Sequence, residues 1–268
     1  MIAEADSFQK ECDALAALLA PLGDADYGRA TQFKDWTIDD IMAHLNSGDV
    51  NARQTLLDPA AFVASREQRQ AAVAQGTAPL EYQRQATGGL SGKARLAAWR
   101  ASAAETANAY RDADPKQRVE WVGPSMSARS SITARLMETW SHAQAIYDLL
   151  GVERIDDDRI HAIAHLGAIT FGWTFANRGE APPGPPPHVR LQAPSGAIWE
   201  WNAEAGGENR VEGPATAFCQ VVAQTRNIAD VDLVVTGPVA TEWMAKAQCF
   251  AGKANDPPPP GARFRQTG

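Results

Sequence analysis

The chain has few cysteines and no long hydrophobic run, and each absence excludes a class of protein. Its 268 residues include three cysteines, Cys12, Cys219 and Cys249, with no C-x-x-C motif. Such spacing favours reduced, buried thiols over a disulfide framework. No apolar run reaches the ~18 residues of a membrane span, and the acidic N-terminus lacks the pattern of a secretory signal. We therefore expect a cytoplasmic protein with no membrane partner.

Positive charge is also scarce. The sequence has 25 Lys and Arg against 32 Asp and Glu, for a net charge of −7. This balance argues against a nucleic-acid partner, because phosphates are neutralised by a basic face. The sequence also lacks a glycine-rich phosphate loop, a G-x-S-x-G elbow and a dinucleotide-binding G-x-G-x-x-G unit. The expected partners are small molecules, and nothing indicates an oligomeric state.

One change in composition divides the chain. Residues 1–180 are alanine-rich with helical periodicity and end at a proline-rich linker, 181–188 (APPGPPPH), which cannot be helical. Short strands and helices are predicted over 189–252, followed by a tail over 253–268. The predicted fold is α+β with two domains: an antiparallel four-helix bundle and a smaller C-terminal α/β domain.

Apolar periodicity and end signals place the individual elements. Four core helices are predicted. The first spans about 3–20, the second begins at a cap at Thr37, the third spans about 93–111, and the fourth runs from a cap at Ser130 or Ser131 to about 150. A fifth helix is predicted after 156–158. Residues 60–90 are polar and form an excursion between core helices. In the second domain the pattern predicts strands at 188–192, 197–202 and 232–236, and helices at about 213–224 and 239–250.

Three residues form a candidate metal site. Glu138 and His142 are four residues apart on one predicted helix, so they share a face one turn apart. His44 lies on another core helix and points partly inward. Two histidines and one glutamate match the composition of open catalytic zinc sites. The spacing alone is also compatible with a hydrogen-bonded helix pair, and His44 with an ordinary core or surface histidine.

A second histidine pair offers a competing site. His161 and His165 are also four residues apart, and with one carboxylate they would form an alternative ligand set. A non-functional alternative is that they lie on a helix face covered by the second domain. A functional alternative is that His165 lines the cleft between the bundle and the C-terminal domain. Trp36, Trp140 and Trp173 either wall a pocket or pack in the core.

Several segments resemble a known family. DWTIDDIMAHL (35–45) and RLMETWSHAQ (135–144) resemble the metal-binding N-terminal domain of mycothiol-dependent maleylpyruvate isomerase, in the DinB/YfiT-like superfamily of four-helix bundles. Residues 213–252 are similar to the second domain of that group, which is sterol-carrier-like. Residues 165–179 resemble the joining segment of an uncharacterised subgroup. The resemblance covers nearly the whole chain.

The resemblance implies a site and a cofactor. It assigns His44, Glu138 and His142 as metal ligands and zinc as the metal, although such a set also accepts Ni²⁺, Fe²⁺ or Mn²⁺. It implies a low-molecular-weight thiol: mycothiol, bacillithiol or glutathione. An arginine of the second domain would hold the substrate carboxylate; Arg226 is the first match and Arg210 the second.

Two functions follow from these observations. The first is a metal- and thiol-dependent isomerase or S-transferase that acts on a small electrophilic, carboxylated substrate, with His165 and Trp140 contacting the cofactor. The second is a non-catalytic metal-binding protein whose C-terminal domain holds an apolar ligand. The 60–90 excursion and the proline-rich linker depart from the isomerase pattern and leave the substrate open.

Overall fold

The computed structural model describes residues 1–121, 123, 125–205 and 207–267. The chain forms two compact units, Met1–Leu149 and Leu150–Gly268. The first is almost entirely helical, and the second combines helices with a four-stranded sheet. Both units are therefore parts of a mixed α and β protein, as predicted.

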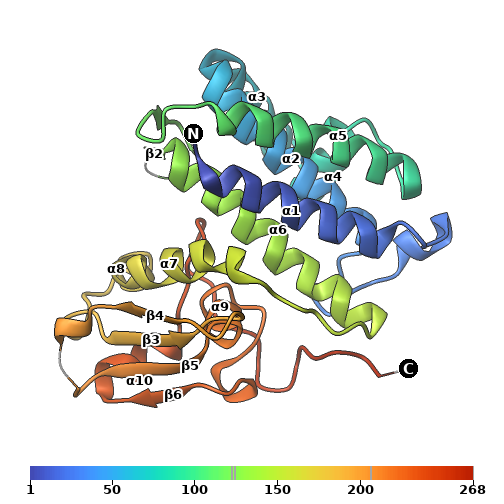
Figure 1. Cartoon of the computed structure of the whole chain (residues 1–268). Helices are drawn as coiled ribbons and strands as arrows, with labels where there is room; N and C mark the ends of the chain where they lie inside the picture. The colour runs from blue at the N-terminus through green and yellow to red at the C-terminus, as the bar shows by residue number, and fades with distance from the viewer. Residues whose placement is uncertain (122, 124, 206, 268) are drawn as a thin grey trace. The chain divides into compact units, whose positions relative to one another are not determined.

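Four long helices dominate the first unit (Figure 1). They are α1 (Ala3–Leu19), α2 (Ile38–Leu57), α5 (Gly92–Arg111) and α6 (Ala128–Leu150). Strands β1 (Arg118–Val119) and β2 (Met126–Ser127) pair antiparallel between α5 and α6. The long helices lie where the apolar periodicity predicts core helices, and their inward faces are buried.

Local capping sets where the two helices of the candidate site begin. Thr37 forms a capping box with Asp40: its hydroxyl accepts from the Asp40 amide at 3.1 Å, and its own amide donates to the Asp40 carboxylate at 2.9 Å. Helix α6 begins earlier than predicted. The Ser127 hydroxyl accepts from the Ser130 amide at 3.1 Å, so the cap is Ser127 and not Ser130 or Ser131.

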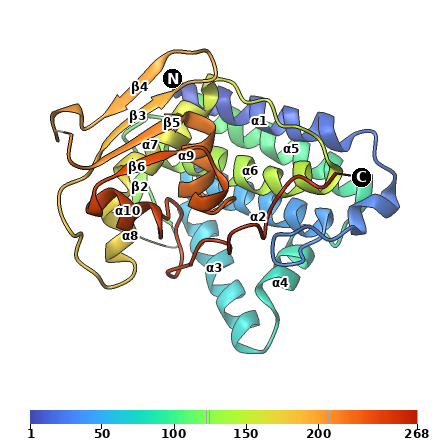
Figure 2. The same cartoon turned by 90° about the horizontal axis from the view of Figure 1, so that it is seen from below.

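The polar excursion folds into two further helices. They are α3 (Pro59–Ala74) and α4 (Pro79–Ala86), and Figure 2 shows them projecting beyond the long helices. Both pack against α2. Phe62 is the buried residue of α3, and α4 has none among the residues described. The excursion therefore adds surface beside α2 rather than core.

The second unit contains the four-stranded sheet. Its strands are β3 (His188–Gln192), β4 (Ile198–Trp201), β5 (Arg210–Pro214) and β6 (Val234–Thr236), in the order β4-β3-β5-β6. The β3–β4 hairpin is antiparallel, as predicted, and β3 pairs parallel with β5. Its helices are α7 (His161–Ile169), α8 (Phe171–Ala176), α9 (Ala215–Val222) and α10 (Pro238–Met244).

The second unit differs from the sequence prediction in three places. It begins at Leu150, whereas the expected domain boundary lies at 180. The physical reason is close packing of α7 on α9: a Cβ on Gly167 would meet Val222 at 2.7 Å. Strand β5 occupies residues where the start of a helix was expected, and the last helix ends at Met244 rather than near 250.

No helix in the part of the chain that the structure describes is long and apolar enough to cross a membrane.

Candidate metal centre

The three predicted ligands meet between α2 and α6. His44 comes from α2, and Glu138 and His142 come from successive turns of α6. The Nε2 atoms of His44 and His142 lie 3.2 and 3.4 Å from Oε2 of Glu138. One ligating atom from each residue lies within 4.8 Å of the others. Among the described residues, this is the one group of three or more His, Cys, Asp or Glu side chains arranged to hold a metal ion.

The geometry of the donors suits a small divalent cation. Zinc bonds of about 2.0–2.2 Å in a tetrahedral arrangement place neighbouring ligand atoms roughly 3.3–3.6 Å apart. The two nitrogen–oxygen distances at Glu138, 3.2 and 3.4 Å, fall in or near this range. Two imidazole nitrogens and one carboxylate oxygen are also donor types that zinc binds. The residues present therefore fit a metal ion.

The protonation states also suit metal binding. Burial lowers the pKa of His142 to about 4, even though the hydrogen bond to Glu138 acts to raise it. Burial acts to raise the pKa of Glu138, but hydrogen bonds from His142 and His44 outweigh it and hold that pKa well below its usual range. At neutral pH the site therefore presents a neutral His142 and an ionised Glu138, the forms that coordinate a metal.

Two aromatic side chains wall the histidines. Trp36 lies parallel to His142 with ring centroids 5.8 Å apart, and it meets His44 at 5.3 Å. Phe33 contacts His142 edge-on at 4.8 Å. Trp36 therefore lines the candidate metal centre, which is one of the two places expected for it from the sequence. Phe33 was not predicted from the sequence, although the pair F-x-x-W directly before the α2 cap is a usable signal.

A strained turn positions these aromatic rings. Lys34 and Asp35 lie between the rings and have left-handed φ angles of 54° and 57°. The Trp36 amide donates to the Phe33 carbonyl at 2.9 Å, and the Thr31 amide donates to the Trp36 carbonyl at 2.8 Å. Left-handed non-glycine residues cost about 1–3 kcal/mol each and persist where surrounding contacts fix them. The turn therefore contributes to the wall of the site.

A buried ion pair ties α2 to α6 beside the ligands. Arg135 Nε donates to Asp49 at 2.8 Å, and Trp99 of α5 donates to the other carboxylate oxygen at 3.0 Å. Asp49 and Arg135 are 0% and 2% exposed. Arg135 precedes Glu138 by three residues on α6, and its Nη2 also donates to the Leu45 carbonyl of α2 at 3.2 Å. This contact fixes the axial position of the two ligand-bearing helices.

The competing histidine set is not assembled in the described residues. His161 contacts Trp199 at 4.7 Å, and His165 Nδ1 accepts from Trp201 Nε1 at 3.0 Å. Their neighbours are thus aromatic rings of β4, and no carboxylate joins them in a metal-binding group there. The alternative metal site at this pair therefore has no geometric support among the described residues.

The remaining predicted residues belong to the second unit or lie inside the core of the first. Trp140 of α6 is 0% exposed, which favours the packing interpretation. Arg226 and Arg210 belong to the second unit. Arg226 donates to the Thr225 carbonyl at 3.0 Å, and Arg210 lies 3.6 Å from Glu212. The contacts of Arg226 and His165 with substrate and cofactor stay predictions.

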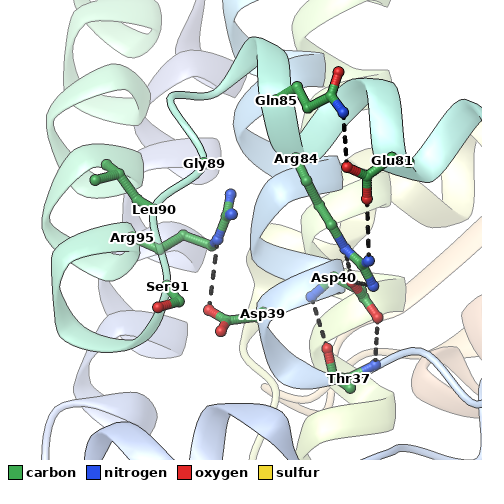
Figure 3. Close-up of a pocket in the computed structure, with 10 residues that line it drawn as sticks. All are labelled: Thr37, Asp39, Asp40, Glu81, Arg84, Gln85, Gly89, Leu90, Ser91 and Arg95. Atoms are coloured by element: carbon green, nitrogen blue, oxygen red, sulfur yellow. Dashed lines mark hydrogen bonds and ion pairs between the residues drawn. The ribbon is translucent and has the colours of Figure 1, made fainter. Parts of the chain in front are cut away.

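A polar cavity of about 350 Å³ lies at the N-terminus of α2 (Figure 3). Its two arginines each face an aspartate. Arg84 Nε donates to Asp40 at 2.6 Å, and Arg95 Nε lies 3.5 Å from Asp39. Arg95 is buried, and its Nη1 also donates to Thr87 at 2.9 Å. Both cations are thus compensated by carboxylates of the chain, so the cavity offers little uncompensated charge to a ligand.

Comparisons with known proteins identify the family of the chain. Residues 8–147 match the sequence model described as the mycothiol maleylpyruvate isomerase N-terminal domain. Two uncharacterised proteins of Mycobacterium tuberculosis, strains CDC 1551 / Oshkosh and ATCC 25618 / H37Rv, are 34% identical over 251 residues, covering 94% of this chain and 94% of each relative.

Two solved structures share the fold. They are the mycothiol-dependent maleylpyruvate isomerase and a histidine-to-alanine mutant of that enzyme, with TM-scores of 0.51 and 0.52. Each is 17% identical to this chain, and the match covers 83% of this chain and 88% of the other. At this identity the likeness shows the fold. The matched family model spans the helices that carry all three ligands. The chain belongs to the mycothiol maleylpyruvate isomerase family.

Proposed function

We propose that this protein is a metal- and low-molecular-weight-thiol-dependent enzyme, an isomerase or an S-transferase, that acts on a small electrophilic, carboxylated substrate. The observation that carries the proposal is the convergence of His44, Glu138 and His142, from two helices, within 4.8 Å. Three protein ligands leave a coordination position for another molecule, which is typical of catalytic rather than structural sites. Membership in the family supports the thiol.

Each ligand has a distinct task. His44 and His142 supply imidazole nitrogens, and Glu138 supplies the single negative charge of the set. A bound divalent ion, for which zinc is our first choice, would act as a Lewis acid that lowers the pKa of a coordinated thiol below its free value of ~8.5. Phe33 and Trp36 cover the imidazoles and limit the access of water to them.

The burial of the cysteines supports a small molecule as the source of the reactive thiol. Cys12, Cys219 and Cys249 are buried, with exposed fractions of 2%, 0% and 5%. Burial raises the pKa of Cys12 and of Cys219 well above the usual value, which disfavours the nucleophilic thiolate. The buried cysteines therefore support a thiol cofactor rather than a cysteine nucleophile.

The same proposal assigns roles to both units. The α1, α2, α5 and α6 helices support a DinB-like bundle, and the small sheet of the second unit supports a sterol-carrier-like domain. Arg226 is proposed to hold a substrate carboxylate, because guanidinium groups bind carboxylates bidentately. His165 is proposed to contact the cofactor.

Metal analysis of His142→Ala tests the centre. We expect the wild type to bind about one metal ion per chain and the variant to lose most of it, together with any thiol-dependent activity. His188→Ala is the matched control, because it removes another histidine–glutamate pair, His188–Glu200 at 3.1 Å. Unchanged metal content in His142→Ala would remove this site from consideration.

A spectroscopic experiment tests the open position. The Co²⁺-substituted protein is titrated with glutathione, mycothiol and bacillithiol, and the visible spectrum is recorded. We expect one thiol to change the spectrum and then to support turnover of an unsaturated acid. A spectrum unchanged by every thiol would favour the non-catalytic metal-binding protein instead.

A further inference from the structure

A second cavity lies between α2 and the excursion helices α3 and α4. Its volume is about 170 Å³. The lining residues are Ser47, Val50, Asn51, Gln54, Phe62, Ser65, Arg66, Arg69, Tyr82, Ala86 and Thr87. The cavity lies entirely within the first unit, and most of its polar groups come from the segment that departs from the isomerase pattern.

The charge of this cavity is positive and uncompensated. Arg66 and Arg69 form no hydrogen bond or ion pair with any residue that the structure describes, and none of the lining residues is acidic. The chain as a whole carries a net charge of −7. In the neighbouring cavity, by contrast, Arg84 and Arg95 each face an aspartate. The Arg66–Arg69 pair is therefore available to an anion from outside the chain.

Buried polar atoms at the cavity also lack partners. Arg66 Nε is a buried donor and Gln54 Oε1 a buried acceptor, and neither forms a hydrogen bond within the described residues. Such groups are costly unless a ligand or water pairs with them. Phe62, which is 4% exposed, adds an apolar wall. A planar oxyanion attached to a short carbon chain matches this combination of two guanidinium groups and an apolar surface.

Helix geometry places this cavity beside the metal centre. Ser47 and Asn51 of its lining follow His44 by three and seven residues on α2, so all three share one face of the helix. The rise of the helix places them about 4.5 and 10.5 Å further along its axis than His44. A small molecule held by the arginines would therefore extend along α2 toward the ligands.

We propose that the cavity is the binding site for a carboxylate of the small-molecule substrate, with Arg66 and Arg69 as its specificity-determining residues. The inference rests on the proposed function, because the substrate is the electrophile that reacts at the metal centre. Under this inference, residues 60–90 bind a carboxylate of the substrate, a role that the proposed function gives to Arg226 of the second unit as well.

Isothermal titration of the metal-loaded protein with succinate, and separately with inorganic phosphate, tests this site. We expect succinate to bind, and Arg66→Gln or Arg69→Gln to weaken it at least about tenfold each, the effect of losing one charge-assisted contact. Arg66→Lys keeps the charge but loses the planar fork, so it should weaken binding less than Arg66→Gln. Arg100→Gln, an exposed arginine of α5, is the matched control and should bind as the wild type does.

The outcomes separate this inference from the proposed function. All variants should retain the wild-type circular dichroism and metal content, because neither arginine is a ligand. Wild-type affinity in the Arg66→Gln/Arg69→Gln double variant, or no succinate binding at all, would overturn the cavity assignment while the metal centre stands. Binding of phosphate without succinate would overturn the carboxylate assignment. Failure of the proposed function would instead appear as loss of metal or thiol binding in the wild type.

Discussion

At the scale of single residues, burial distinguishes His142 from an ordinary helix-surface histidine. An exposed glutamate–histidine pair at i,i+4 contributes only ~0.2–0.5 kcal/mol. Here the imidazole is 9% exposed, stacked on Trp36 and within hydrogen-bond distance of Glu138. Burial keeps it neutral through most of the acid range, which preserves its lone pair for a metal.

This protonation state predicts an acid-sensitive stability of the metal-free protein. The pKa of His142 is about 4 in the folded state, below the ordinary value of 6.5. Between these values the unfolded chain binds a proton that the folded chain does not, so stability falls as pH falls from 6.5 toward 4. The expected loss is up to about 3 kcal/mol. Urea unfolding of chelator-treated protein at pH 7 and pH 4.5 measures it.

The His142→Gln variant provides the control for this pH effect. It removes the titrating imidazole, so its stability should fall less over the same interval. The depressed pKa of Glu138 acts in the same direction, because its contribution is present above the ordinary pKa and lost as pH falls further. Parallel pH profiles for the wild type and the variant would contradict the prediction.

Residue spacing and the family resemblance were enough to single out the three residues that the structure brings together, but not their surroundings. Glu138 and His142 follow from the helical repeat, and His44 follows from its place on a core helix. Asp49 and Arg135 were not predicted as partners, because they lie far apart in sequence and meet through tertiary packing. For the same reason the sequence could not show that Arg66 and Arg69 lack partners.

At the scale of elements, the metal centre depends on the relative position of α2 and α6. The Asp49–Arg135 pair is buried and lies within two turns of the ligands on both helices. Removing one partner of a buried ion pair lowers the free energy of unfolding by about 3–5 kcal/mol, because the other charge is left buried and unpaired. Helix packing and ligand geometry are therefore coupled.

Gly48→Ala tests this coupling without changing a charge. A Cβ at Gly48 would lie 2.5 Å from Nη1 of the buried Arg135, so the guanidinium or the helix must shift. We expect a loss of about 1–3 kcal/mol in the free energy of unfolding, despite the higher helix propensity of alanine. Metal affinity should fall as well, measured by competition with a chromogenic chelator.

Gly172→Ala is the matched control for this substitution. Gly172 lies in α8, and a Cβ there would meet nothing within 4 Å. Its substitution should therefore be neutral or stabilising by up to about 1 kcal/mol and leave metal affinity unchanged. Equal effects of the two substitutions would show that Arg135 adapts freely, against the coupling inferred here.

Local signals predicted elements better than they predicted domains. The Thr37 cap and the β3–β4 hairpin have strong short-range signals, and both are confirmed. Strand β5 was missed because its pairing partner, β3, lies about twenty residues earlier and no turn signal joins them. The unit boundary at Leu149 depends on the packing of α7 against α9. A change in amino-acid composition along the chain does not reveal such packing.

At the scale of the whole molecule, metal binding should stabilise the folded chain. A ligand that binds only the folded state adds RT ln(1 + [L]/Kd), or about 2.7 kcal/mol at a hundredfold excess over Kd. For a chain of this size we expect a rise in Tm of about 5–10 °C. Calorimetry with Zn²⁺ and after chelation measures the change.

The metal-centre variant again supplies the control. In His142→Ala the same additions of Zn²⁺ and chelator should leave Tm nearly unchanged. A rise in Tm with Zn²⁺ that persists in this variant would place the stabilising ion elsewhere in the chain.

The division of the ligands between two helices has a further consequence. Glu138 and His142 are fixed relative to each other by one backbone, whereas His44 belongs to a separate helix. Slippage of α2 past α6 by a single turn would carry His44 about 5.4 Å away and break the set. The amount of bound metal should therefore report on the relative position of α2 and α6. A substitution far from the site that shifts one helix should lower metal binding even though all three ligand side chains are unchanged.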